Sequence, residues 1–299
     1  MRSGLECVPC FIRQALDAAR FVSADPAVHE RVLRRVLVEL SDLDYAASPP
    51  EIGARVHRLV RELSGSSDPY AEAKRRFTER ALAVYPKLRA RVAESEDPFV
   101  AALRLAAAGN IIDLGANGSL RDADVEAVLE RASSVPVDDR AVESLRAACG
   151  RAESILYLAD NAGELVLDRL LFEQLRARRV QVAVKGGAVI NDATRVDAEQ
   201  AVIGESVEII DTGSDTPGVV LSEVSDEFRL AFDTADVVIA KGQGNYEALS
   251  TAPREVFFLL IVKCGVVAED IGTHAGALYV GQRLPDREAE SRQATPEEV

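Results

Sequence analysis

Residues 155–164 read ILYLADNAGE, an apolar run that leads through an aspartate, an asparagine and a glycine into a helical stretch. Residues 155–158 have no polar face, which is typical of a strand that helices cover on both sides. Asp160 and Asn161 follow this strand at once, before the turn at Gly163. A buried strand that passes through a polar turn into a helix is the repeating unit of a parallel α/β sheet.

The same unit recurs along the second half of the chain. Short apolar or β-rich runs, which we interpret as strands, cover residues 111–114, 155–158, 180–184, 207–210, 237–240, 257–262 and 278–280. Helical stretches such as 164–176 alternate with these runs. The alternation predicts an α/β fold with a Rossmann-like, doubly wound, mostly parallel sheet.

The first third of the chain has a different pattern. Apolar residues repeat at helical spacing up to about residue 95, for example at Val28, Val32 and Val36, and no strand pattern interrupts them. Breaks at 25–26, 48–50 and 64–69 contain proline or glycine and separate the helices. We therefore predict a helical domain over residues 1–100, a Rossmann-like catalytic domain over 101–285, and a flexible polar tail over 286–299.

Composition limits the partners of the protein. Of the 299 residues, 47% are hydrophobic, which allows a sizeable core. The net charge of −14 repels nucleic acids and anionic membranes. The apolar runs are too short to span a bilayer, and the N-terminus lacks a signal-peptide pattern. We expect a soluble, cytoplasmic protein that binds neither nucleic acid nor membrane; its oligomeric state is open.

Polar residues gather where the predicted strands end, and ligands of a doubly wound sheet bind beyond the carboxyl ends of its strands. The residues at these ends are Asp160 and Asn161, then Lys185 and Asp192, then Lys241, Gly242, Gln243, Gly244 and Asn245, and finally Lys263. Carboxylate and amide oxygens suit Mg²⁺ or Mn²⁺. Lysines and a glycine-rich helix entrance suit a phosphate. Each segment alone is equally typical of a helix cap or turn, but together they favour metal-assisted phosphoryl transfer.

The same residues stand in motifs of a known family. The motifs are Cys7-x-x-Cys10, GNIID at 109–113, DNAGE at 160–164, NDAT at 191–194, KGQGNYE at 241–247, and Lys263-Cys264. In this order and spacing the chain resembles the damage-control phosphatases, formerly domain of unknown function 89, and most of all their compact microbial subfamily. The resemblance covers nearly the whole chain. One departure is Gly265, where the family pattern has proline, and it removes no proposed site residue.

The resemblance implies a helical region on a Rossmann-like domain, and a metal-dependent phosphatase acting on sugar phosphates or damaged phosphometabolites. It implies that Asp160, Asn161 and Asp192 hold Mn²⁺, Mg²⁺, Co²⁺ or Ni²⁺. It also implies that the phosphate-binding residues are Lys241, Gly242, Gln243, Gly244, Asn245 and Lys263, with Glu164 beside the substrate. In the mechanism we expect, Lys241 and Lys263 neutralise the phosphoryl oxygens. Asp192, Asp160 and Glu164 are all candidates for the general base, and a metal hydroxide could make a base unnecessary.

Two other function classes compete with a phosphatase. One is an S-adenosylmethionine-dependent carboxyl methyltransferase, because GANG at 115–118 follows the first predicted strand, although the glycine fingerprint there is incomplete. The other is a non-catalytic protein that binds a phosphometabolite. A covalent aspartyl-phosphate enzyme needs a second aspartate two residues after Asp160, where this chain has Ala162. Metal-dependent phosphate release separates these classes.

Several other polar residues lack a clear ligand pattern. Cys7 and Cys10 have no second cysteine pair to complete a zinc site, so we expect buried structural thiols. His29 and His57 lie in amphipathic stretches and are expected at a surface or an interface. Asn110 and Asp113 fit either a loop hydrogen bond or a role supporting the site. Asp197 is expected to support the loop that carries Asp192.

Overall fold

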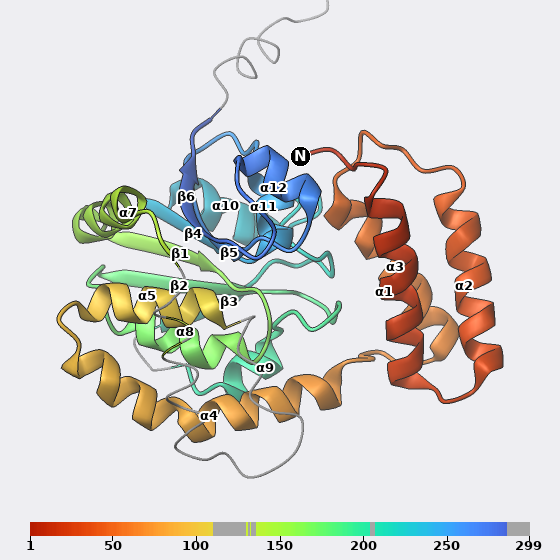
Figure 1. The fold of residues 1–299 in the computed structure, drawn as a ribbon, viewed down its shortest axis with the longest axis horizontal. Coiled ribbons are helices and arrows are strands. Elements are labelled where there is room, and N and C mark those ends of the chain that lie inside the picture. Colours follow the sequence, from red (N-terminus) through yellow and green to blue (C-terminus); the bar gives the residue numbers. More distant parts are fainter. Residues whose placement is uncertain (110–129, 131, 133–135, 204–206, 286–299) are drawn as a thin grey trace, which may run out of the picture.

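The computed structural model describes residues 1–109, 130, 132, 136–203 and 207–285 (Figure 1). Its helices are α1 Cys7–Val22, α2 Pro26–Leu40, α3 Pro49–Ser64, α4 Ala71–Glu94, α5 Pro98–Ala108, α7 Asp139–Arg151, α8 Glu164–Phe172, α9 Arg195–Gln200, α10 Asp226–Thr234, α11 Gln243–Leu249 and α12 Gly265–Ile271. Its strands are β1 Ser154–Leu158, β2 Arg179–Val184, β3 Val207–Asp211, β4 Val237–Lys241, β5 Val256–Ile261 and β6 Leu278–Arg283. The strand predicted at 111–114, the glycines at 115–118, Asn110, Asp113 and the tail from 286 lie outside the described residues.

The described strands form a single sheet in the order β3-β2-β1-β4-β5-β6. The first five are mutually parallel, and β6 runs antiparallel to β5. Leu158, at the carboxyl end of β1, pairs with Ala183 of β2 on one side and Ala240 of β4 on the other. The chain therefore adds β2 and β3 on one side of β1, then crosses back and adds β4, β5 and β6 on the other side. This confirms the predicted α/β fold and places the crevice at the ends of β1 and β4.

Alternate side chains of each central strand enter two different cores. Ile155 and Tyr157 of β1 belong to a core that includes buried residues of α5, α7 and α8. Leu156 and Leu158 point to the opposite face, where the core contains residues of α10, α11 and α12. Figure 1 shows these helices on the two sides of the sheet. Burial on both faces explains why these strands are continuous apolar runs.

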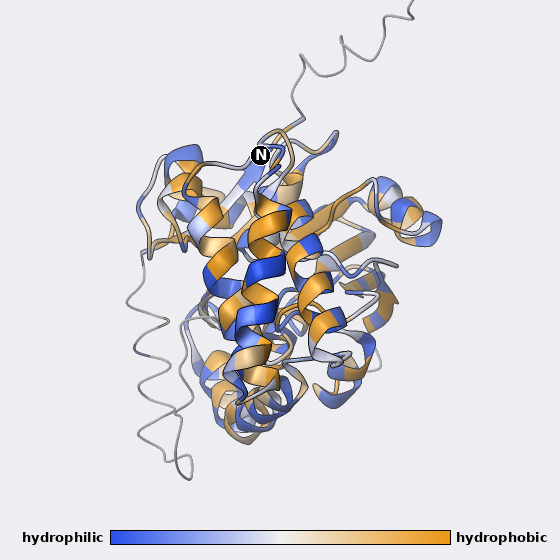
Figure 2. Cartoon of the chain, turned by 90° about the vertical axis from the view of Figure 1, so that its right-hand side faces the viewer, coloured by the Kyte–Doolittle hydropathy of each residue, from blue (hydrophilic) through white to orange (hydrophobic). Residues whose placement is uncertain are grey.

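Helices α1, α2 and α3 form a separate layer with an apolar core of their own. This core includes Phe11, Val36 and Ile52, each at most 4% exposed. In Figure 2, which faces this layer, hydrophobic and hydrophilic residues alternate around its helices. Helices α4 and α5 instead contribute to the core of the sheet, through residues such as Leu88 and Leu103. The boundary predicted near residue 100 remains a prediction.

Local sequence signals fix the ends of α3, the helix of this layer that matters most below. Two prolines occupy its first turn, and Ser48 and Glu51 form a reciprocal capping box with the backbone. Gly65 ends the helix with φ of 71°, a left-handed conformation that favours glycine. His57 of α3 was expected at a surface or an interface; it is 2% exposed, so it does not lie at the surface. It lies one turn from buried Val60, on the same face.

No helix in the described part of the chain has both the length and the apolar character needed to cross a membrane.

Candidate functional site

A cavity of about 400 Å³ lies between the loops at the carboxyl edge of the sheet and the layer of α1–α3. This volume is within the range of small-molecule sites. Its sheet side is lined by Asp160, Asn161, Ile190, Asn191, Asp192, Pro217, Gly218, Gln243, Gly244, Glu247, Lys263, Cys264 and Val266. Its helical side is lined by Glu6, Cys7, Cys10, Phe11, Arg13, Gln14, Pro49, Pro50 and Gly53. The cavity therefore combines polar side chains at strand ends with a wall contributed by the N-terminal helices.

The loops that follow β1 and β2 bring the three predicted metal ligands together. The backbones of Asn161 and Asp192 form an isolated bridge. The carbonyl of Asp160 accepts a hydrogen bond from Ala193 N at 2.8 Å, and Asn191 O accepts one from Ala162 N at 3.0 Å. Asp160, Asn161 and Asp192 are 9%, 5% and 4% exposed, and all three line the cavity. Residues some thirty positions apart in the sequence thus form one polar end of the cavity.

Lys185, at the end of β2, lies beside Asp192. Its Nζ is 3.6 Å from Asp192 Oδ2, and its side chain is buried. Burial raises the pKa of Asp192 to about 7, an effect that the positive charge of Lys185 opposes. Burial also lowers the pKa of Lys185, against the attraction of Asp192 and Asp160. Desolvation therefore outweighs the ion pair at both groups, and further positive charge in the cavity would favour the carboxylate of Asp192.

Lys241, at the end of β4, is directed into the protein rather than into the cavity. Its Nζ donates to Glu164 Oε2 at 3.0 Å and to Asp168 Oδ1 at 2.9 Å, and all three side chains are at most 1% exposed. The other oxygen of Glu164 accepts a hydrogen bond from Asn161 Nδ2 at 2.5 Å. Burial raises the pKa of Glu164 to about 7 although the charge of Lys241 opposes this. Lys241 is thus linked to the cavity indirectly, because it bonds to Glu164 and Glu164 in turn holds the side chain of Asn161.

Asp168 was missed by the sequence analysis, and it completes this cluster. It lies one helical turn after Glu164 on α8, directly after buried Leu167, and is fully buried. A carboxylate at helical spacing from Glu164, in a stretch that is apolar apart from Arg169, is the signal that could have found it.

The glycine-rich segment after β4 approaches Asp160 closely. Gly242 has φ of 82°, and a Cβ at this position would lie 2.1 Å from the Asp160 carboxyl group, so only glycine fits. Asn245 is 1% exposed, and its Nδ2 donates to the carbonyls of Lys241 and Ala159 at 2.7 and 3.2 Å. Asn245 therefore stabilises the turn from the buried side, away from solvent. Gln243 and Gly244 line the cavity itself.

Lys263 is the predicted lysine that faces the cavity, and it is exposed to solvent. Its backbone N donates to Gln243 Oε1 at 2.7 Å, which joins the loops that follow β4 and β5. Asp197 supports the β2 loop as expected, because its carboxylate accepts hydrogen bonds from Thr194 N at 2.9 Å and from Lys74 Nζ at 2.8 Å.

The expectation for the two N-terminal cysteines is corrected. Cys7 and Cys10 are half-buried free thiols that line the cavity, not buried structural ones. The first turn of α1 faces the cavity, and Cys7 also packs against the helical core, of which Phe11 is the first buried residue in α1. Together with Arg13 and Gln14, the two cysteines form a wall of the site; the Cys7-x-x-Cys10 motif lies in this wall, but the sequence analysis gave it no place at the site.

The chemistry of this polar end fits a divalent cation. Four buried carboxyl groups, those of Asp160, Glu164, Asp168 and Asp192, lie near two buried lysines, Lys185 and Lys241, so acidic groups outnumber basic ones and a bound cation would favour their charged forms. Oδ2 of Asp192 accepts no hydrogen bond from the described residues. Among these residues, no trio of His, Cys, Asp or Glu is placed to hold an ion alone, so the amide oxygen of Asn161 would be the third donor. Hard oxygen donors and an excess of acidic groups suit Mn²⁺ or Mg²⁺.

A doubly wound sheet with carboxylates and lysines at its switch point is typical of α/β enzymes that handle phosphorylated ligands. Comparison with known proteins narrows this class. The model of the damage-control phosphatase ARMT1-like domain matches residues 4–278. The chain therefore belongs to the damage-control phosphatase ARMT1-like family, and it is a phosphatase.

Similar proteins cover almost the whole chain. A damage-control phosphatase of Pyrococcus horikoshii is 33% identical over 93% of this chain and 97% of its own length. A damage-control phosphatase of Archaeoglobus fulgidus is 32% identical over 90% of this chain and 95% of its own. The crystal structure of a DUF89 family protein from Pyrococcus horikoshii has a TM-score of 0.86 and 33% identity, and the match covers 95% of this chain and 99% of that one. These matches confirm the family indicated by the motifs.

Proposed function

We propose that the protein hydrolyses small phosphate monoesters, such as sugar phosphates or damaged phosphometabolites, with a divalent cation held by Asp160, Asn161 and Asp192. The observation that carries this proposal is the convergence of these oxygen donors from two loops at one end of a cavity of about 400 Å³, where Lys263 faces the same space. Mn²⁺, Mg²⁺, Co²⁺ and Ni²⁺ are the candidate ions. The expected compartment is the cytoplasm.

The side chains around the cavity have different roles in the proposed reaction. When bound, the cation would supply positive charge to the phosphoryl oxygens and lower the pKa of a water molecule. Lys263, on the solvent side, neutralises charge on the phosphoryl group. Gln243 and Gly244 line the space where the phosphate binds. Their loop is fixed by the hydrogen bond from Lys263 N to Gln243.

The general base in this proposal is a carboxylate that lines the cavity. Of the three candidates, Asp160 and Asp192 line it, whereas Glu164 lies behind Asn161 and bonds to Lys241. A base must be within hydrogen-bond distance of the water that it deprotonates, so Asp160 or Asp192 is better placed than Glu164. Glu164 instead holds the amide of Asn161, and Lys241 favours the charged form of Glu164 against the effect of burial.

A phosphate-release assay tests this function. The full chain is incubated with a panel of phosphorylated metabolites and with each of the four cations, and with a chelator as the metal-free control. We expect release that needs a cation. The variants Asp160→Asn and Asp192→Asn should each lose at least about 100-fold in kcat/KM. The matched control is Asp233→Asn, an exposed aspartate on α10 that pairs with Arg229, and it should retain full activity.

The alternatives give different results in the same assay. Methyl transfer from S-adenosylmethionine without phosphate release would establish a methyltransferase, and binding of sugar phosphate without turnover under any cation would establish a binding protein. Full activity in either site variant would remove the metal assignment.

A further inference from the structure

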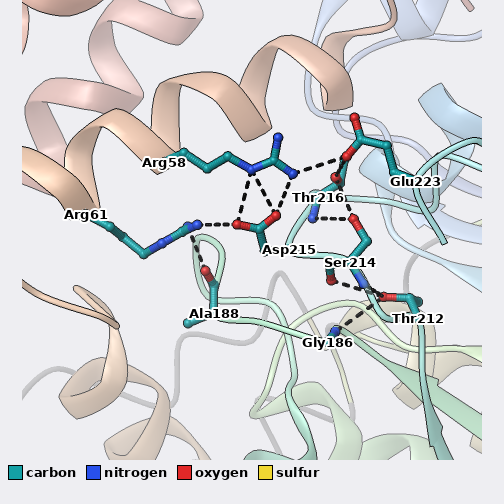
Figure 3. Close-up of polar contacts among 9 residues, drawn as sticks. All are labelled: Arg58, Arg61, Gly186, Ala188, Thr212, Ser214, Asp215, Thr216 and Glu223. Carbon is teal, nitrogen blue, oxygen red and sulfur yellow. Dashed lines mark hydrogen bonds and ion pairs between the residues drawn. The ribbon is translucent and has the colours of Figure 1, made fainter. Parts of the chain in front are cut away.

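Two arginines of α3 join the helical layer to the loops at the carboxyl edge of the sheet (Figure 3). Arg58 donates to Asp215 Oδ1 from Nε at 3.0 Å and from its terminal nitrogen at 2.5 Å, and it also reaches Glu223 at 3.2 Å. Arg61 forms an ion pair with the other carboxylate oxygen of Asp215. The loop that follows β3 is therefore held by α3 at two points.

Arg61 has a second contact that Arg58 lacks. Its other terminal nitrogen donates to the carbonyl of Ala188 at 2.8 Å, in the loop that follows β2. Ala188 lies four residues before Asp192, and the turn between them is closed by a hydrogen bond from Asp192 N to Val189 O at 3.1 Å. Figure 3 shows the guanidinium of Arg61 between Asp215 and Ala188. Arg61 thus connects α3 to the segment that carries a proposed metal ligand.

The loops after β2 and β3 also touch each other directly. A Cβ on Gly186 would lie 2.7 Å from the backbone of Gly213, and one on Gly187 would lie 3.0 Å from Asp215. The amide of Gly186 donates to Ser214 O at 2.9 Å. Such close backbone contact transmits the position of one loop to the other.

Ile190 gives independent evidence that the helical layer holds the β2 loop in shape. Its φ is +46°, a left-handed conformation that a β-branched residue rarely adopts. Its side chain packs against the apolar core of α1–α3 and lines the cavity. Strained backbone conformations persist where the surroundings determine them, and here the surroundings are the helices.

We propose that Arg61 is a positioning residue for the metal site: by joining α3 to Ala188 and Asp215 it fixes the β2 loop so that Asp192 meets Asp160 and Asn161. The helical layer then sets the affinity for the cation as well as closing the cavity. This inference rests on the proposed function, because it concerns the same metal site.

An arginine suits this task because its planar guanidinium presents several donors in fixed directions. One nitrogen of Arg61 binds a carbonyl while another binds a carboxylate. A lysine has one nitrogen at the end of a flexible stem, so Arg61→Lys keeps the charge but not the simultaneous contacts. The side chain of Arg61 is 18% exposed, which shields both contacts from solvent.

Calorimetric titration of the full chain with Mn²⁺ alone tests the inference without relying on turnover. We expect Arg61→Ala to weaken Mn²⁺ binding by about 10-fold or more, the usual effect of losing a partner that orients a metal ligand. Arg61→Lys should fall between Arg61→Ala and the wild type. The matched control is Arg58→Ala, which breaks ion pairs to the same Asp215 from the same helix. Because Arg61 then still holds both Asp215 and Ala188, the Mn²⁺ affinity of Arg58→Ala should stay within about twofold of the wild type.

Phosphate release at increasing Mn²⁺ then separates positioning from general damage. Saturating Mn²⁺ should restore Arg61→Ala to nearly wild-type kcat, because the cation itself gathers its ligands. Wild-type Mn²⁺ affinity in Arg61→Ala, or equal weakening in Arg58→Ala, would overturn the inference while the wild-type phosphatase activity stands. A wild type that neither binds Mn²⁺ nor releases phosphate would overturn the proposed function as well.

Discussion

The two walls of the cavity differ in how their side chains are held. On the sheet wall, Asp160, Asn161 and Asp192 are at most 9% exposed and are surrounded by charged and hydrogen-bonding partners. On the helical wall, Cys7, Cys10 and Gln14 are half-buried and Arg13 is exposed, above a core that is almost entirely apolar. Groups that perform chemistry need fixed geometry, whereas groups that select a substrate tolerate change. We therefore expect the sheet wall to carry the chemistry and the side chains that line the helical wall to contribute to substrate choice.

The largest expected effect comes from two lysines at neighbouring strand ends. Lys241→Met leaves Glu164 and Asp168 buried without their cation, and breaking such a cluster costs about 3 to 5 kcal/mol of unfolding free energy. Lys263→Met removes an exposed lysine, so stability should change by less than about 0.5 kcal/mol. Its kcat/KM should nevertheless fall by about 100-fold, since Lys263 lines the cavity in which we propose that the phosphate binds.

Urea unfolding and phosphate release measure the two effects separately. If Lys241→Met were as stable as Lys263→Met, the buried cluster would not hold the sheet wall in place, and the contrast between the walls would weaken.

The fold, and the part of the site at the ends of β1 and β2, could be predicted from the sequence, whereas the direction of Lys241 and the helical wall could not. Strands buried on both faces are continuous apolar runs, so they can be recognised in the sequence. Because the carboxyl ends of parallel strands meet at one edge of the sheet, Asp160 and Asp192 could be predicted to lie together there, as they do. The inward direction of Lys241 was not predictable, because its partners Glu164 and Asp168 are 77 and 73 residues away. The helical wall and the contact of Arg61 with Ala188, 127 residues apart, likewise depend on tertiary packing alone.

The helical layer has a buried titratable group, His57, and its effect on stability should follow pH. Burial, assisted by the charge of Arg61, lowers the pKa of His57 to about 4 from 6.5, and its Nε2 has no hydrogen-bond partner among the described residues. Between pH 4 and 6.5 the unfolded chain binds more protons at this site. The contribution of His57 is therefore present above pH 6.5 and is lost as the pH falls towards 4, by about 3 kcal/mol.

His57→Phe isolates this contribution, because it keeps a ring at the edge-on contact with Tyr70 and removes the titrating group. The unfolding free energy from urea denaturation is compared at pH 7.5 and 4.5 in both proteins. The variant should lose less stability than the wild type over this interval. Equal losses would mean that His57 is hydrated when folded and that the helical layer is less tightly packed than the sheet.

The smallest expected effect probes substrate choice at the helical wall. Arg13 lines the cavity from α1 and is exposed, so it can contact a second anionic group of a substrate through solvent-screened attraction. Arg13→Ala should raise KM about fivefold for substrates that carry a carboxylate or second phosphate, the effect of losing about 1 kcal/mol. It should leave kcat unchanged, because the contact is equal in the ground and transition states.

Arg20→Ala is the control: Arg20 is on the same helix but pairs with Asp17 away from the cavity, so the KM of this variant should match that of the wild type. A fall in kcat for Arg13→Ala would show that the helical wall takes part in the chemistry, and the division between the two walls would then fail.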